Sequence, residues 1–114
     1  MMVGENIFEI FFRNRLMKQK MKTYQERAEE VMNFIRLSDK ADETAENLSF
    51  AELKLLSLAR ALTTQPDLIL LDEPASGLDP QSLDKILPLI KQLTAQGKTV
   101  LLIEHNLDVI RSIT

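Results

Sequence analysis

The sequence holds 114 residues with 17 acidic and 14 basic side chains, which gives a formal net charge of −3. This length allows one small domain or a piece of a larger one, and it excludes two full domains. The acidic balance gives no general reason to expect a nucleic acid partner. Cysteine is absent, so disulfides and thiolate metal sites are excluded. No uninterrupted apolar run approaches the roughly 20 residues that a membrane-spanning helix needs.

The first part of the chain, residues 5–37, has a helical pattern. Ala28, Val31, Met32 and Ile35 recur at steps of three and four residues, which is typical of an amphipathic helix. Residues 38–47 are polar and predict a connector with room for a short helix. We therefore expect an all-helical unit over residues 1–47.

From residue 48 onward the predicted elements alternate between helix and strand, which is typical of a parallel βαβ unit. These elements are helices over residues 51–64 and 106–114 and strands over residues 68–72 and 99–103. Ser49 and Glu52 have the spacing of a capping box at the start of the helix expected over residues 51–64. Both strands are nearly all apolar, which predicts strands buried on both faces of a parallel sheet.

The helix between the two strands is expected to begin at Pro80 with Asp79 as its cap, and to end at Gly97. Pro88 lies inside this helix and has no backbone N–H to donate. We therefore expect a kink or a break one turn earlier, near Asp84.

Two adjacent carboxylates, Asp72 and Glu73, follow the first strand directly. Parallel strands end at the same edge of a sheet, so Glu104 and His105, after the second strand, are expected beside them. One carboxylate of such a pair can hold the metal of a magnesium nucleotide while the other orients or deprotonates water. Because alternate residues point to opposite faces, both can be bidentate ligands of one ion only if the strand twists at its end. Taken alone, the pair is equally well explained as a strand end that begins a loop.

Five segments of the chain occur in a distinctive order. They are Leu-Ser-Phe-Ala-Glu at residues 48–52, Leu-Ala-Arg-Ala-Leu at 58–62, Leu-Ile-Leu-Leu-Asp-Glu-Pro at 68–74, Ser-Gly-Leu-Asp at 76–79 and Ile-Glu-His at 103–105. Together they resemble the nucleotide-binding subunit of ABC transporters, with its signature motif, Walker B strand, D-loop and switch histidine. The resemblance is close over residues 48–110 and looser over residues 3–47.

The resemblance implies an α/β fold: a partial P-loop NTPase (RecA-like) core with parallel strands, preceded by an α-helical subdomain. Residues 1–47 would form the helical subdomain, and residues 48–114 would form the signature helix and the C-terminal part of the ATPase core. ATP and Mg²⁺ would be the cofactors. Asp72 would serve Mg²⁺, Glu73 would be the general base, and His105 would sense the γ-phosphate.

The resemblance also implies contacts with other subunits. Ser49, Ala51 and Glu52 would face the ATP of a second ATPase subunit in a head-to-tail dimer, and Asp79 would contact that subunit. A membrane-spanning permease subunit would hold the protein at the inner face of the cell membrane, on the cytoplasmic side. Within the family, Leu-Ile-Glu-His-Asn at residues 102–106 is most similar to importers of branched-chain amino acids.

The chain also departs from the family pattern. Phe50, Ala51 and Glu52 stand where the family has Gly-Gly-Gln, and the Ala51 methyl group obstructs a backbone approach that glycine allows. None of its three glycines belongs to a G-x-x-x-x-G-K-[ST] phosphate loop. We therefore expect a truncated or split ATPase that lacks the Walker A half and is inactive alone. The alternative is a non-catalytic interaction module that docks on a transporter subunit.

Overall fold

The computed structural model describes residues 7–114, which form four α-helices, two short 3₁₀ helices and two strands. In chain order the elements are α1 (Ile7–Phe34), η1 (Ser38–Lys40), η2 (Ala45–Asn47), α2 (Phe50–Leu62), β1 (Leu68–Asp72), α3 (Pro80–Ala95), β2 (Thr99–Ile103) and α4 (Leu107–Ile113). This order confirms the predicted helical first part and the alternation of helix and strand after it. Each helix within residues 7–114 is too short or too polar to cross a membrane.

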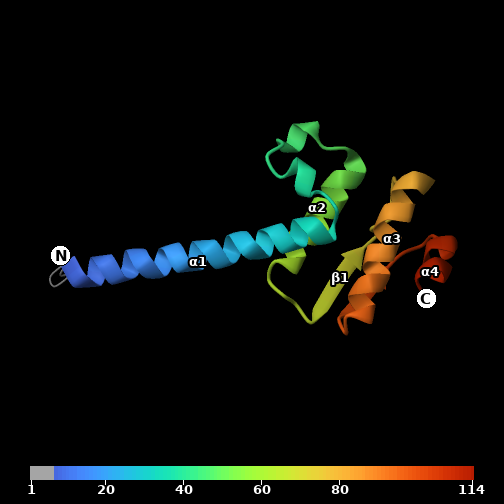
Figure 1. Cartoon of the computed structure of the whole chain (residues 1–114). Coiled ribbons are helices and arrows are strands. Elements are labelled where there is room, and N and C mark those ends of the chain that lie inside the picture. The colour runs from blue at the N-terminus through green and yellow to red at the C-terminus, as the bar shows by residue number, and fades with distance from the viewer. Residues whose placement is uncertain (1–6) are drawn as a thin grey trace, which may run out of the picture.

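Helix α1 gives the molecule its elongated shape. Figure 1 shows it as a single rod whose N-terminal end lies far from the sheet, and the molecule measures 62 × 31 × 26 Å along its principal axes. Only the last turns of α1 join the core, through Val31, Phe34 and the buried Ile35 that follows the helix. The helix was expected from residue 5, but residues 1–6 lie outside the described part of the chain.

The two strands form a parallel sheet in which Ile69 pairs with Val100 and Leu71 with Leu102. These residues point to the face on which α2 and α3 pack. Ile69 lies in one cluster with Leu58 and Leu62 of α2 and Leu93 of α3. Burial of this apolar surface stabilises the βαβ unit and holds the ends of both strands in register.

The opposite face of the sheet corrects one prediction from the sequence. Leu70 and Leu101 are 67% and 56% exposed, and Leu68 and Ile103 on the same face are exposed as well. Burial on both faces is therefore wrong for this chain. The physical reason is that the helices packing on the sheet, within residues 7–114, all lie on the side of Ile69.

Helix α3 is continuous through Pro88, so the expected break near Asp84 does not occur. A proline removes one hydrogen bond within a helix. Here the buried side chains on both sides of Pro88, Ile86 before it and Leu89 and Ile90 after it, hold the helix against the core. Apolar packing therefore compensates for the missing bond, and only a bend within a continuous helix remains as the prediction.

The helix starts follow the sequence prediction closely. Ser49 Oγ accepts from the Glu52 N–H at 3.2 Å, and Glu52 Oε2 accepts from the Ser49 N–H at 2.8 Å, which completes the capping box of α2. Asp79 Oδ1 accepts from the Ser82 N–H at 2.8 Å and caps α3. Gly97, with φ +86°, turns the chain from α3 toward β2.

Candidate functional site

The chain turns sharply at Glu73, directly after β1. Glu73 has φ +48°, in the left-handed region that residues other than glycine rarely adopt. Its N–H donates to the carbonyl oxygen of Ile103 at 2.8 Å and so extends the pairing with β2 by one bond. This conformation interrupts at Glu73 the alternation of side-chain directions that runs along β1.

The turn brings Glu73 to the only histidine of the chain. Nδ1 of His105 lies 2.8 Å from Glu73 Oε1, and the two side chains are 76% and 42% exposed. The predicted meeting of residues from the two strand ends is therefore confirmed for this pair. The imidazole restrains one carboxylate oxygen, and the carboxylate remains open to solvent, as a base that acts on water must be.

Two further charged side chains hold the loop that carries Glu73. Lys54 Nζ, from α2, donates to the carbonyl oxygens of Ser76 at 2.6 Å, Glu73 at 3.2 Å and Pro74 at 3.3 Å. From the end of β2, Glu104 Oε1 accepts from the Ala75 N–H at 3.2 Å. Glu104 belongs to the segment at residues 103–105, whereas Lys54 lies outside the five segments, and the sequence predicted neither of these loop contacts.

The start of α2 also contacts the loop after Glu73. A methyl group added to Gly77, which has φ +73°, would come 3.1 Å from the Phe50 ring. Lys54 Nζ lies 5.2 Å from the centroid of the same ring. Phe50, one of the departures from the family pattern, therefore packs on the loop and covers Lys54 from one side.

Glu52 is paired with Lys40 and with the backbone of Ser49. Its Oε1 forms an ion pair with Lys40 Nζ at 2.5 Å, and its other oxygen belongs to the capping box. The Lys40 ammonium, together with the backbone N–H of Ser49, holds the pKa of the Glu52 carboxyl below its ordinary value. The same hydrogen bond raises the pKa of Lys40. The negative charge of Glu52 is thus already compensated within the chain.

This ion pair predicts how stability depends on pH. A carboxyl whose pKa is lowered by folding stabilises the fold above its unfolded pKa of about 4.3, and this contribution is lost as the pH falls through the folded pKa. We expect Glu52→Gln to reduce the loss of stability between about pH 5 and pH 2, as measured by the urea midpoint. Glu46→Gln, at an exposed position on η2, is the control and should keep the full loss. Equal acid dependence in both variants would contradict the role of the pair.

Five of the seven predicted site residues line two separate hollows, and His105 lines neither of them. Asp72 and Glu73 line one of about 320 Å³ together with Lys54. Ser49, Ala51 and Glu52 line another of about 260 Å³ together with Lys40 and Lys85. Asp79 lines neither of them, and its carboxylate is used as the cap of α3, which lowers its pKa through the hydrogen bonds from Ser82.

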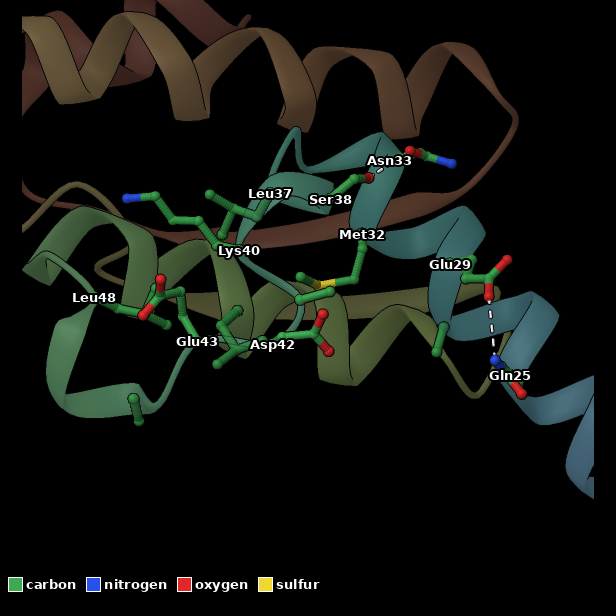
Figure 2. A pocket seen from close by; sticks show the side chains of 14 residues that line it. Gln25, Glu29, Met32, Asn33, Leu37, Ser38, Lys40, Asp42, Glu43 and Leu48 are labelled. Atoms are coloured by element: carbon green, nitrogen blue, oxygen red, sulfur yellow. Dashed lines mark hydrogen bonds between the residues drawn. The ribbon is translucent and has the colours of Figure 1, made fainter.

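A third hollow, of about 710 Å³, lies between the end of α1 and the connector. Figure 2 shows Gln25, Glu29, Met32 and Asn33 on the helix side and Asp42 and Glu43 on the connector side, with a 3.4 Å hydrogen bond between Gln25 and Glu29. None of the predicted site residues lines this hollow. Its walls belong mostly to residues 25–45, with Leu48 and Leu56 beside them, so it does not extend the acidic site.

The carboxylates fit a magnesium ion only in the presence of other ligands. Within residues 7–114 no three histidine, aspartate or glutamate side chains converge as a metal cage. Mg²⁺ is commonly held by one or two carboxylates together with water and the phosphates of a nucleotide. Asp72, exposed at the end of β1, has the chemistry of such a single carboxylate ligand.

Comparison with known proteins gives consistent results for sequence and fold. A family model described as ABC transporter matches residues 1–76. The methionine import ATP-binding protein MetN 2 of Rhodococcus jostii (strain RHA1) is 39% identical over 89 residues, which cover 77% of this chain and 26% of that protein. The chain therefore spans about a quarter of this relative.

Solved structures agree with the sequence match. A nucleotide-free ATP-binding cassette from an ABC transporter matches with a TM-score of 0.77 at 32% identity, and the match covers 97% of this chain and 44% of that chain. A dimeric bacterial ABC transporter cassette matches with a TM-score of 0.65 at 34% identity. This match covers 76% of this chain and 38% of the chain of that cassette. The expected fold class, a partial P-loop NTPase core with parallel strands behind a helical part, is confirmed. The chain belongs to the ABC transporter family and has the fold of part of its ATP-binding cassette.

Proposed function

We propose that this chain supplies the catalytic carboxylates of an ATP-hydrolysing cassette that drives transport. The observation that carries the proposal is the contact between Glu73 and His105, 2.8 Å apart, on a loop that the fold holds in an unusual backbone conformation. Such conformations persist where the surrounding structure imposes them, and they are frequent at functional sites. The match to the ABC transporter family supports the same role.

In this proposal each of three side chains at the strand ends has a distinct task. Glu73 orients the attacking water and accepts its proton, while Nδ1 of His105 keeps the carboxylate turned toward that position. Asp72 would hold Mg²⁺ as one carboxylate ligand, and the ion would supply positive charge to the phosphates of ATP. His105 leaves most of its ring exposed, so it is also available to the γ-phosphate.

The start of α2 is proposed to face the ATP of a second ATPase subunit in a head-to-tail arrangement. The positive end of a helix dipole favours an anion, and Ser49 caps α2 while Ala51 stands in its first turn. The pairing of Glu52 with Lys40 supports this role, because it removes an uncompensated negative charge from the approach of a phosphate. Asp79 is proposed to contact the same subunit.

We further propose transport of amino acids as the cellular task. A relative that is 39% identical is named for methionine import, and the segment at residues 102–106 is similar to importers of branched-chain amino acids. A membrane-spanning permease would then hold the cassette at the cytoplasmic face of the membrane. The domain boundary at residues 47 and 48 would separate the part that meets the permease from the part that meets the nucleotide.

Calorimetric titration with Mg-ATP tests this function. The chain alone, whose sequence has no phosphate loop, is expected to show no micromolar binding. Joined to a polypeptide that carries the phosphate loop of a family member, it is expected to bind and hydrolyse ATP. Micromolar binding by the chain alone would contradict the expectation that ATP binding requires a phosphate loop. Binding without hydrolysis in the joined form would instead favour a non-catalytic docking module.

A further inference from the structure

We propose that Lys54 and Glu104 are positioning residues that clamp the loop of residues 73–76 from two sides and so fix the direction of the Glu73 side chain. The inference rests on the proposed function, because it concerns the group given the role of general base. It goes beyond that proposal by assigning roles to two residues outside the predicted site. Neither residue needs to contact nucleotide or water for this task.

Lys54 holds the carbonyl side of the loop. Its ammonium donates to three carbonyl oxygens within four consecutive residues, those of Glu73, Pro74 and Ser76, at 2.6–3.3 Å. An ammonium has three protons, so these bonds use its full donor capacity. Three carbonyl groups that point at one cation would repel one another without it. Lys54 therefore favours the tight loop conformation over an extended one.

Glu104 holds the amide side of the same loop. Its Oε1 accepts from the Ala75 N–H at 3.2 Å, at a residue between two of the carbonyl groups that Lys54 binds. Ala75 is 9% exposed, so its amide group has little access to water. Hydrogen bonds to charged groups are stronger than neutral ones, and both sides of this clamp are of that kind. The two contacts come from different elements, α2 and the end of β2.

The backbone at Glu73 explains why a clamp is useful. With φ +48° the residue is in a sparsely populated region, and such a conformation persists only where its neighbours impose it. On one side the N–H of Glu73 is held by Ile103, and on the other its carbonyl oxygen is held by Lys54. The contact of the side chain with His105 depends on this backbone direction. Loss of the clamp should therefore loosen the contact between Glu73 and His105.

Nuclear magnetic resonance of the labelled full chain, without nucleotide, tests the clamp. We expect Lys54→Met to shift the carbonyl carbon resonances of residues 73, 74 and 76 and the ring nitrogen resonances of His105. Hydrogen exchange at the Ala75 amide, which donates to Glu104, should become about tenfold faster or more, because a loop released by Lys54 opens more often. Lys54→Arg, which keeps a cation with several donors, should restore most of the signals. Lys91→Met, at an exposed position on α3, is the matched control and should change none of them.

The second side of the clamp is tested in the same way. Glu104→Ala should speed exchange at Ala75, whereas Glu104→Gln, which keeps a carbonyl oxygen at the same place, should restore protection. The thermal midpoint is followed for each variant, because a merely structural role would move the midpoint but would not move the His105 resonances selectively. Spectra of Lys54→Met and Glu104→Ala that equal the control at the loop and at His105 would overturn the inference.

Two features keep the test decisive. If Lys54→Met does not fold, a scalar coupling through the hydrogen bond from Lys54 Nζ to the Ser76 carbonyl is measured in the unchanged chain, and its absence overturns the clamp. The assay contains no ATP, so its failure would leave the proposed hydrolytic role of Glu73 standing. Conversely, a Glu73→Gln variant that hydrolyses ATP normally would remove the proposed function while the clamp signals remained.

Discussion

Replacing Glu73 with glutamine is expected to lower the rate of ATP hydrolysis by about 10²–10⁴-fold, the usual contribution of a general base. The assay uses the chain joined to a phosphate-loop polypeptide of a family member. Glutamine keeps the size of the side chain and a carbonyl oxygen toward His105 Nδ1, but it cannot accept a proton from water. The loss should therefore lie in kcat. The KM for Mg-ATP should change little, because the phosphate loop of the joined polypeptide binds the phosphates.

The controls for this experiment separate chemistry from folding. Glu46→Gln also removes one negative charge, but at an exposed position on η2 that is distant in sequence from the loop. It should leave kcat unchanged. Hydrogen exchange at the β1 and β2 amides should be the same in both variants. Hydrolysis by Glu73→Gln within about threefold of the unchanged chain would contradict the assignment of the base, since it falls far short of the effect of general-base loss.

The features that the sequence predicted well depend on neighbouring residues. Both strands occur over the predicted residues, and the caps at Ser49 and Asp79 bind the predicted helix starts. A cap needs only a side chain and an N–H two or three residues away, so its signal is local. The meeting of Glu73 with His105 was also predictable, because parallel strands end at one edge. The roles of the individual site residues stay predictions.

The features that the sequence did not predict depend on partners far along the chain. Lys54 contacts a loop that begins 19 residues later, and Lys40 contacts Glu52 across 12 residues. No periodic pattern contains such distances. The apolar strands predicted burial on both faces, but burial also requires a second layer of helices, and one face of this sheet has Leu70 and Leu101 exposed. The hydrophobic pattern of a sequence shows which side chains favour burial. Whether they are buried depends on the elements that pack on them.

The largest effect on stability is expected from Leu93→Ala. Leu93 lies on α3, is 1% exposed, and joins Leu58, Leu62 and Ile69 in one cluster between the helices and the sheet. Removing a buried leucine side chain costs its transfer free energy and leaves a cavity, together about 2–5 kcal/mol. A small domain is stable by only about 5–15 kcal/mol, so this single change is a large share of the total. The free energy of unfolding in urea measures it.

Two leucine-to-alanine controls test whether burial, and not leucine itself, causes the loss. Leu16→Ala, in the middle of α1 at 51% exposure, should change the free energy of unfolding by no more than about 0.5 kcal/mol. Leu70→Ala, at 67% exposure on the open sheet face, should cost far less than Leu93→Ala, apart from a small strand-propensity term. A loss at Leu70 as large as that at Leu93 would mean that the open face is covered in solution. The difference in the free energy of unfolding between Leu93→Ala and Leu70→Ala therefore shows on which face of the sheet the core of this chain lies.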